Sequence, residues 1–240
     1  MRRILALSTA VALLTGCSAA PEEVTPPTEG ATVAPATPPE GETAPTPVNG
    51  ETRDFTIDEH ATFTTGWAMT FLPGTDHLLI AERRGALQLR DQTTGEVTEI
   101  TGLPEVHAQG QAGMHDIIPG PTFEQDGMIY LSWVRPHTNG AQGVVGRAYL
   151  DMTGHQLTGL QEIWEQTPAA GNGHLSLRLL IDGDHLYVTS GDRQEMTPAQ
   201  ENDTNLGSVL RLTLDGRPAP DNPLGTEQWT MGHRNPPGID

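Results

Sequence analysis

The feature that most constrains the fold is a strand pattern that recurs at intervals of 50 to 60 residues. Each copy has an apolar residue, a polar turn with aspartate, a short run of Leu, Ile, Tyr and Val, and a polar end. The copies are residues 72–84, 123–135 and 181–193. Their strands start at Leu78, Ile129 and Leu186, which are 51 and then 57 residues apart. Repeats of this length that contain several short strands are typical of β-propeller blades.

More strands follow within each repeat. A second strand ends at a turn glycine each time, at Gly95, Gly154 and Gly216, and a further short strand follows in the first two copies (EVTEI and LQEIW). We therefore predict an all-β chain folded as a β-propeller. A β-sandwich would also contain many short strands, but the long repeat favours the propeller. Only about three to three and a half blades fit, and a propeller needs at least four. The expectation is a propeller that is incomplete at its C-terminus, in the opening of a further blade.

The N-terminal residues differ in composition, so the propeller domain is assigned to residues 53–240. Residues 1–17 have two arginines, a short apolar run and small residues, the pattern of a secretory signal rather than a membrane span. This segment ends in Leu-Thr-Gly-Cys, which resembles a bacterial lipobox, so we expect a lipid on Cys17, the single cysteine. Residues 18–52 are rich in Pro, Thr, Ala and Glu, have no aromatic residue and are predicted to be a disordered tether. The expected location is outside the cytoplasm, with the protein lipid-anchored to the membrane at the cell envelope, on the periplasmic side or the cell surface.

The charge of the chain excludes several classes of function. The net charge is −18, and none of the 13 basic residues is a lysine. Nucleic acid is therefore not an expected partner, because no basic patch is available to bind phosphates. A Schiff-base lysine and a Walker-type phosphate loop are excluded as well, because both require lysine.

A predicted hairpin supplies the first candidate site. The alternation in LRLLI and HLYVT predicts two strands, and Asp182-Gly183 between them is a hairpin turn signal. His174 precedes the first strand and Asp192 follows the second, so pairing of the strands would bring the two residues to the same end. A histidine and a carboxylate in contact can act as a general base and the group that orients it.

Two loops contain further candidates. Residues 109–113 (QGQAG) are small except for glutamine, and Gln111 offers both a donor and an acceptor where backbone or ligand can approach closely. Residues 232–238 place Arg234 and Asn235 between glycines and prolines, as a rigid loop that presents two polar side chains would require.

In this order the segments resemble the pyrroloquinoline-quinone (PQQ)-dependent sugar dehydrogenases. More narrowly, they are similar to the soluble aldose sugar dehydrogenases of the glucose/sorbosone dehydrogenase family. The most specific matches are SGDRQ at 190–194, TNLGSVLRL and PDNP within 199–223, and GHRNPPG at 232–238. The resemblance extends from about Trp67 to Asp240. Members of the family are six-bladed propellers, in agreement with the low blade count here.

The resemblance implies a role for each candidate residue. His174 matches the general base that takes the proton from the C1 hydroxyl of an aldose, while a hydride passes from C1 to the quinone and a lactone forms. Asp192 would hold the imidazole in the required tautomer. Arg234 and Asn235 match residues at the cofactor, and Gln111 matches a glutamine that faces substrate and cofactor. The resemblance does not specify the electron acceptor.

The chain also departs from the family. Members often have glycines directly after the histidine, where this chain has Leu175, Ser176 and Leu177. The family's calcium ligands and further basic residues for the cofactor belong to later blades, so calcium ligands are expected beyond Asp240 and no metal ligand is assigned here. We accordingly expect the 240-residue chain alone to bind the cofactor poorly and to have little or no activity.

Two other functions are compatible with a propeller of this composition. A calcium-dependent propeller lactonase would need carboxylates and asparagines around a central metal, without the histidine and arginine. A non-catalytic propeller could bind proteins or glycans at the cell envelope.

Overall fold

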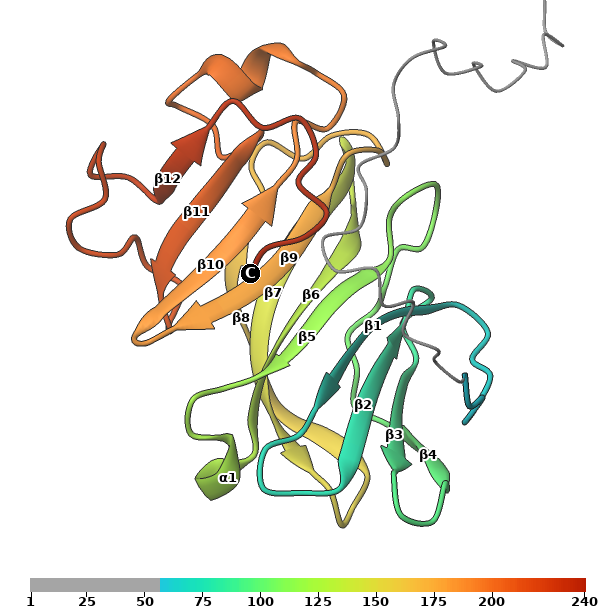
Figure 1. Ribbon diagram of the computed structural model, residues 1–240. Helices are drawn as coiled ribbons and strands as arrows, with labels where there is room; N and C mark the ends of the chain where they lie inside the picture. Colours follow the sequence, from blue (N-terminus) through green and yellow to red (C-terminus); the bar gives the residue numbers. More distant parts are fainter. Residues whose placement is uncertain (1–56) are drawn as a thin grey trace, which may run out of the picture. The chain divides into compact units, whose positions relative to one another are not determined.

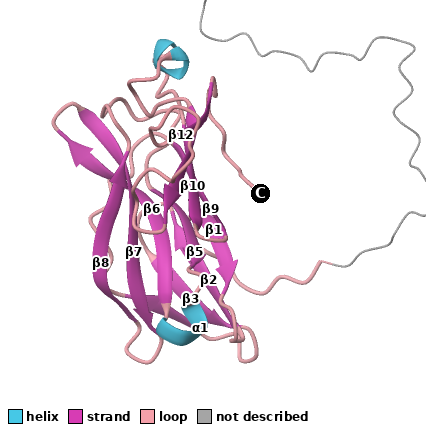
Figure 2. Ribbon diagram, turned by 90° about the vertical axis from the view of Figure 1, so that its left-hand side faces the viewer, coloured by secondary structure: helices cyan, strands magenta, loops and turns pink. Residues whose placement is uncertain are grey.

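The computed structural model describes residues 57–240 and contains three antiparallel sheets of four strands each (Figure 1). The first sheet comprises β1 (Gly66–Phe71), β2 (His77–Glu82), β3 (Leu87–Asp91) and β4 (Val97–Ile100). The second comprises β5 (Met114–Pro119), β6 (Met128–His137), β7 (Gly140–Asp151) and β8 (Gln156–Glu165). The third comprises β9 (Ser176–Asp182), β10 (His185–Ser190), β11 (Ser208–Thr213) and β12 (Gln228–Met231). Figure 2 shows that strands dominate; the helical elements are α1 (Phe123–Asp126) and η1 (Thr197–Gln200).

The sheets are the blades of a β-propeller, which confirms the predicted fold class. Within each sheet the strands lie side by side in chain order, and the first strand of the second sheet, β5, contacts the first strands of both other sheets, β1 and β9. The second strands begin at His77, Met128 and His185, so the observed spacings are the predicted 51 and 57 residues. The fourth strand of the third sheet, β12, was not predicted from the sequence.

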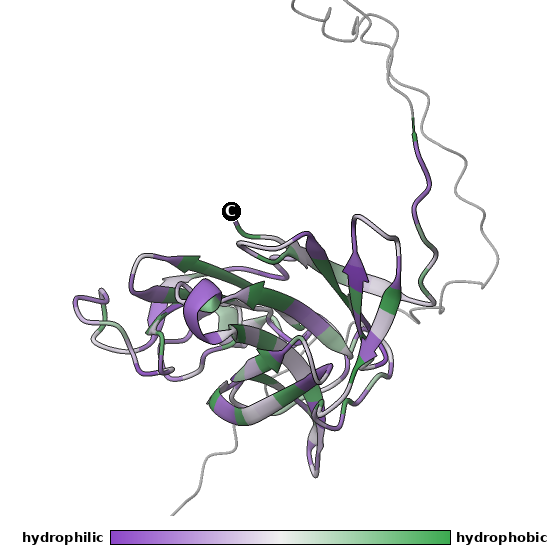
Figure 3. Cartoon of the chain, turned by 90° about the horizontal axis from the view of Figure 1, so that it is seen from below, coloured by the Kyte–Doolittle hydropathy of each residue, from purple (hydrophilic) through white to green (hydrophobic). Residues whose placement is uncertain are grey.

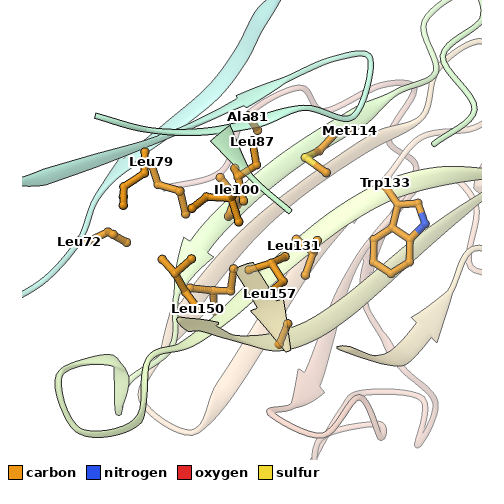
Figure 4. Packing of buried hydrophobic residues seen from close by; sticks show 14 of the residues in the cluster. Leu72, Leu79, Ala81, Leu87, Ile100, Met114, Leu131, Trp133, Leu150 and Leu157 are labelled. Carbon is orange, nitrogen blue, oxygen red and sulfur yellow. The ribbon is translucent and has the colours of Figure 1, made fainter. Parts of the chain in front are cut away.

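Two apolar cores hold neighbouring sheets face to face. Figure 4 shows side chains of the first and second sheets pointing toward one another, among them Leu79, Ile100, Leu131 and the fully buried Trp133. The second core joins the second and third sheets in the same way. In Figure 3 the hydrophobic residues lie mainly along the strands, as alternation in half-buried strands requires. Burial of alternate residues between the sheets therefore accounts for their stacking.

The predicted hairpin is present in the third sheet. His185 pairs with Asp182, and Gly183 in the turn has φ 56°, a left-handed conformation that glycine adopts without strain. At the other end of the hairpin Ser190 pairs with Ser176. The segments on either side of the hairpin, which contain His174 and Asp192, therefore start from neighbouring positions.

The predicted signal segment 1–17 with Cys17, the predicted tether 18–52 and the first residues of the predicted propeller domain lie outside the described residues. Across residues 57–240, no helix is long and apolar enough to cross a membrane.

Candidate functional site

His174 and Asp192 form a buried pair at the end of the third sheet. The Nδ1 atom of His174 lies 2.6 Å from Oδ1 of Asp192, and the two residues are only 7% and 2% exposed. The same carboxylate oxygen accepts a 2.8 Å hydrogen bond from the Gln194 amide. Because the carboxylate occupies Nδ1, the imidazole is held in one orientation and Nε2 is the nitrogen left for chemistry. The contact predicted from the hairpin is present.

The motif at residues 190–194 explains how the pair is positioned. A Cβ on Gly191 would overlap the carbonyl oxygen of His174, so glycine permits the close approach of the two segments. Arg193 is 1% exposed and donates to Gln166 Oε1 at 2.7 Å and to the carbonyls of Ala141 and Ala170. Its burial lowers the pKa of the guanidinium to about 10. Arg193 thus fixes the end of the third sheet to the second.

The backbone after His174 is strained. His174, Ser176 and Leu177 have φ values of 47°, 61° and 62°, which L-residues other than Asn and Asp rarely adopt. These last two positions are among those where the sequence departs from the glycines of the resembled family, so the left-handed backbone is kept without glycine. Strain of this kind is concentrated at functional sites in proteins.

Gln111 holds His174 from the second sheet. Its Oε1 accepts a 2.8 Å hydrogen bond from the backbone N–H of His174, and the backbone N–H of Gln111 donates to the Asn172 carbonyl. The Gln111 loop is fixed in turn by Arg83, which donates to the carbonyls of Gly110 and Ala112. Since the side-chain oxygen of Gln111 already accepts a hydrogen bond, the side-chain NH₂ group is the part that can donate to a ligand.

The segment 232–238 lies against the same pair. The Asp192 amide donates to the Arg234 carbonyl at 2.8 Å, while the Arg234 side chain is exposed. Asn235 Oδ1 accepts a 3.0 Å hydrogen bond from the Ser176 hydroxyl, which again directs the amide N–H groups to other partners. The structure therefore brings all five candidates, from three separate parts of the sequence, to one end of the propeller.

A cavity of about 220 Å³ opens beside this pair, where the three innermost strands meet. Its polar and aromatic walls are formed by Trp67, Gln111, His115, Ser176, Arg178 and Asn235. Trp67, His115 and Arg178 belong to β1, β5 and β9, one to each blade. Sequence reasoning did not assign a role to any of these three.

A β-bulge lies at or next to each of these three residues. Each bulge directly follows a regular residue pair of its sheet. These pairs are Gly66–Glu82 in the first sheet, Met114–Trp133 in the second and Ser176–Ser190 in the third. Those partner residues occupy equivalent positions, each five residues after the start of β2, β6 or β10. A bulge inserts one extra residue and redirects its side chain, a device found next to active sites. Trp67 and His115 therefore line the cavity from equivalent positions, whereas in β9 the equivalent residue is Leu177 and Arg178 follows it.

Arg178 and His115 differ in their electrostatic state. The Arg178 guanidinium donates to the carbonyls of Trp67, His115 and Pro237 and lies 3.6 Å from Asp116. Burial, and next the charge of Arg178, lowers the pKa of His115 to about 4, so its ring is neutral at neutral pH. Burial raises the pKa of the Asp116 carboxyl.

A larger cavity of about 520 Å³ lies apart from these residues, between Trp164 and Glu227. Three of its lining residues are hydrogen-bonded to one another: Asn205 donates to Glu227 at 2.7 Å, and Trp164 donates to the same carboxylate group at 3.1 Å. Burial raises the pKa of Glu227. Asn205 belongs to the TNLG segment, which this arrangement explains as a structural link between the second and third sheets.

Metal ligands were assigned to no residue of this chain. Within residues 57–240, no group of three or more His, Cys, Asp or Glu side chains is arranged to hold a metal ion. Calcium therefore stays a prediction from the resemblance.

Comparison with known proteins places the chain in a family. The family model described as Glucose / Sorbosone dehydrogenase matches residues 63–240. Aldose sugar dehydrogenase YliI of Escherichia coli (strain K12) is 32% identical over 205 residues, which cover 82% of this chain and 54% of that protein. Quinoprotein glucose dehydrogenase B of Acinetobacter calcoaceticus is 26% identical over 204 residues, or 72% of this chain and 42% of that protein. The chain spans about half the length of the curated relatives it matches.

Solved structures agree with these matches. The apo-form of the soluble aldose sugar dehydrogenase from Escherichia coli has a TM-score of 0.67 and 31% identity, covering 71% of this chain and 52% of that one. The PQQ-bound form of aldose sugar dehydrogenase from Streptomyces coelicolor has a TM-score of 0.65 and 28% identity, covering 72% and 52%. The chain thus belongs to the glucose/sorbosone dehydrogenase family.

Proposed function

We propose that this chain forms the base-containing part of a site that oxidises aldose sugars at C1 to the lactone with PQQ as cofactor. The observation that carries the proposal is the buried His174–Asp192 pair, with Gln111 and Asn235 on either side of the histidine loop. Family membership and the PQQ-bound structural relative support it.

The available donors fit a planar quinone that carries carbonyl and carboxylate oxygens. The side-chain oxygens of Gln111 and Asn235 are both engaged in holding the loop, so their N–H groups face an acceptor-rich ligand. The exposed guanidinium of Arg234 adds a positive charge that can donate two parallel hydrogen bonds to one carboxylate. PQQ, when bound, supplies the two-electron redox chemistry.

The protein's own part in the reaction is a proton transfer. His174 accepts the proton of the C1 hydroxyl at Nε2, because Nδ1 is bound to Asp192. Asp192 then stabilises the positive imidazolium. Positioned base catalysis of this kind contributes roughly 10²- to 10⁴-fold in rate. Arg234 and Asn235 bind and orient the cofactor.

The test is sugar-dependent dye reduction by the purified chain with PQQ and calcium added, together with PQQ binding followed by tryptophan fluorescence. His174→Gln should abolish turnover and leave PQQ binding within about twofold. His155→Gln is the matched control, because within residues 57–240 His155 forms hydrogen bonds only through its backbone carbonyl. Turnover that persists in His174→Gln contradicts the proposal, and so does a wild-type chain that shows no PQQ binding.

We also propose that the protein is exported and lipid-anchored through Cys17. The support is the lipobox-like segment that ends at this single cysteine. Metabolic labelling with a radioactive fatty acid should mark the wild-type protein in bacterial cells and not Cys17→Ala. Equal labelling of the two proteins contradicts the anchor.

A further inference from the structure

His115 has a buried ring nitrogen without a partner. The residue is 5% exposed, and its Nε2 makes no hydrogen bond within residues 57–240. Most buried polar atoms in proteins are paired with protein groups or with bound molecules, so an unpaired one on a cavity wall points to a bound water or a bound ligand. The ring is fixed in place by its bulge in β5 and by an edge-to-face contact with Trp67, with centroids 6.3 Å apart and planes at 86°.

The charged neighbours of His115 are already engaged. Arg178 directs its N–H groups to the backbone carbonyls of Trp67, His115 and Pro237. The Asp116 carboxylate accepts from the amides of Ile117 and Leu179. Neither side chain is therefore available to Nε2. The ring also has a hydrogen-bonding contact with the backbone of Ser176, and the cavity that His115 lines is the other side from which a partner can approach.

The chemistry of the ring selects the kind of ligand. Because burial holds the pKa of His115 near 4, the imidazole is neutral and has one donor and one acceptor nitrogen. A neutral ring forms no ion pair with a carboxylate of the cofactor. A hydroxyl group both donates and accepts, so it satisfies Nε2 in either tautomer. The indole of Trp67 adds a flat apolar surface against which a sugar ring can pack.

The size of the cavity agrees with a small ligand. Its volume of about 220 Å³ lies below the roughly 300–1,000 Å³ of pockets for drug-sized molecules, so it fits a single-ring compound. We propose that His115 is a positioning residue that binds a hydroxyl group of the sugar through Nε2. The identification of the ligand as a sugar rests on the proposed function.

The test is an NMR titration of the whole chain with D-glucose, without PQQ, that follows the ring nitrogens of His115. In the wild type, Nε2 should shift with saturable glucose binding. His115→Leu should raise the Kd about three- to tenfold, the loss expected for one neutral hydrogen bond. His115→Gln, whose amide can donate and accept, should bind more tightly than His115→Leu. His77→Leu is the matched control, because His77 also has an unpartnered buried ring nitrogen, at the far end of the first blade.

Three results would overturn the proposal. One is an Nε2 resonance that glucose does not change, since a bound water would then be the partner. Another is that His115→Leu and the wild type bind glucose with equal affinity, whether or not the variant binds PQQ more weakly. The third is a wild type without saturable glucose binding. Failure of the proposed redox function can be distinguished from these results, because the glucose titration depends neither on turnover nor on His174.

Discussion

The guanidinium of Arg178 in β9 donates to the backbone carbonyl of Trp67 in β1, 111 residues earlier in the chain, at 3.3 Å. It also donates to the carbonyl of His115 in β5 at 2.9 Å. One side chain thus bonds to the innermost strands of both other sheets. Because these carbonyls lie at the bulges that line the cavity, the interaction that joins the blades also shapes the cavity wall.

Arg178→Lys should lower the stability of the propeller. Lysine has a single ammonium group and cannot reach three carbonyls in different directions. The side chain is 26% exposed, so we expect a loss of about 1–3 kcal/mol in the free energy of unfolding, measured by urea denaturation. Arg217→Lys, at a 79% exposed arginine, should leave the unfolding midpoint unchanged. Equal midpoints for wild type and Arg178→Lys would show that the three bonds do not stabilise the fold.

Gly191→Ala should displace His174. A Cβ at this position would overlap the His174 carbonyl oxygen, which is backbone and cannot move aside cheaply. We expect a loss of about 1–3 kcal/mol in stability, typical of overpacking, and a changed NMR signal of the His174 ring. Gly171→Ala is the control, because a Cβ there meets nothing within 4 Å. An unperturbed His174 signal in Gly191→Ala would contradict the steric argument.

Asp192→Asn should lower turnover more than it changes sugar binding. The amide cannot stabilise an imidazolium, and it binds the wrong tautomer if its NH₂ group faces Nδ1. We expect kcat to fall roughly 10²-fold or more and KM to change less than about threefold. Asp184→Asn, in the hairpin turn at the other end of the third sheet, should retain activity. A fall confined to KM would mean that Asp192 serves binding rather than the base.

Stability should decline below pH 6.5 in a way that depends on His115. Its pKa is 6.5 when unperturbed and about 4 in the folded protein, where burial disfavours the charged ring. Between these pH values the unfolded state binds more protons, so the free energy of unfolding falls as the pH falls. The His115 contribution amounts to on the order of 3 kcal/mol at pH 4.

His115→Leu should remove this contribution and flatten the pH dependence between 6.5 and 4. Denaturant titrations at several pH values measure it. Comparison with the wild type cancels the effects of Asp116 and Glu227, whose carboxyl pKa values burial raises. Equal slopes in wild type and His115→Leu would show that the ring titrates normally in the folded protein.

Much of the blade order was predictable, because it depends on local patterns. The second strands and their 51- and 57-residue spacings follow from alternation and from Asp-containing turns, and the His174–Asp192 contact follows from one hairpin. The strand β12 was missed because QWTM is too short for alternation to mark it.

The cavity wall could not be predicted in the same way. The bulges interrupt alternation in β1 and β5, and the positions of Trp67 and His115 depend on contacts between strands from different blades. One signal was present in the sequence: His115 and Asp116 are two consecutive polar residues in an otherwise apolar strand. The left-handed backbone at Ser176 and Leu177 has no such signal, because neither residue type favours it.

Repetition of one bulge in three blades has a consequence for protein engineering. Positions 67 and 115 are equivalent on separate sheets, and each extra residue stands outside the regular ladder of its own strand pair. A substitution at position 67 or 115 therefore alters the chemistry of the cavity without disturbing the register of any sheet. Arg178, in contrast, forms the hydrogen bonds that join the sheets. Libraries that vary positions 67 and 115 and keep Arg178 should yield folded variants with new ligand preferences.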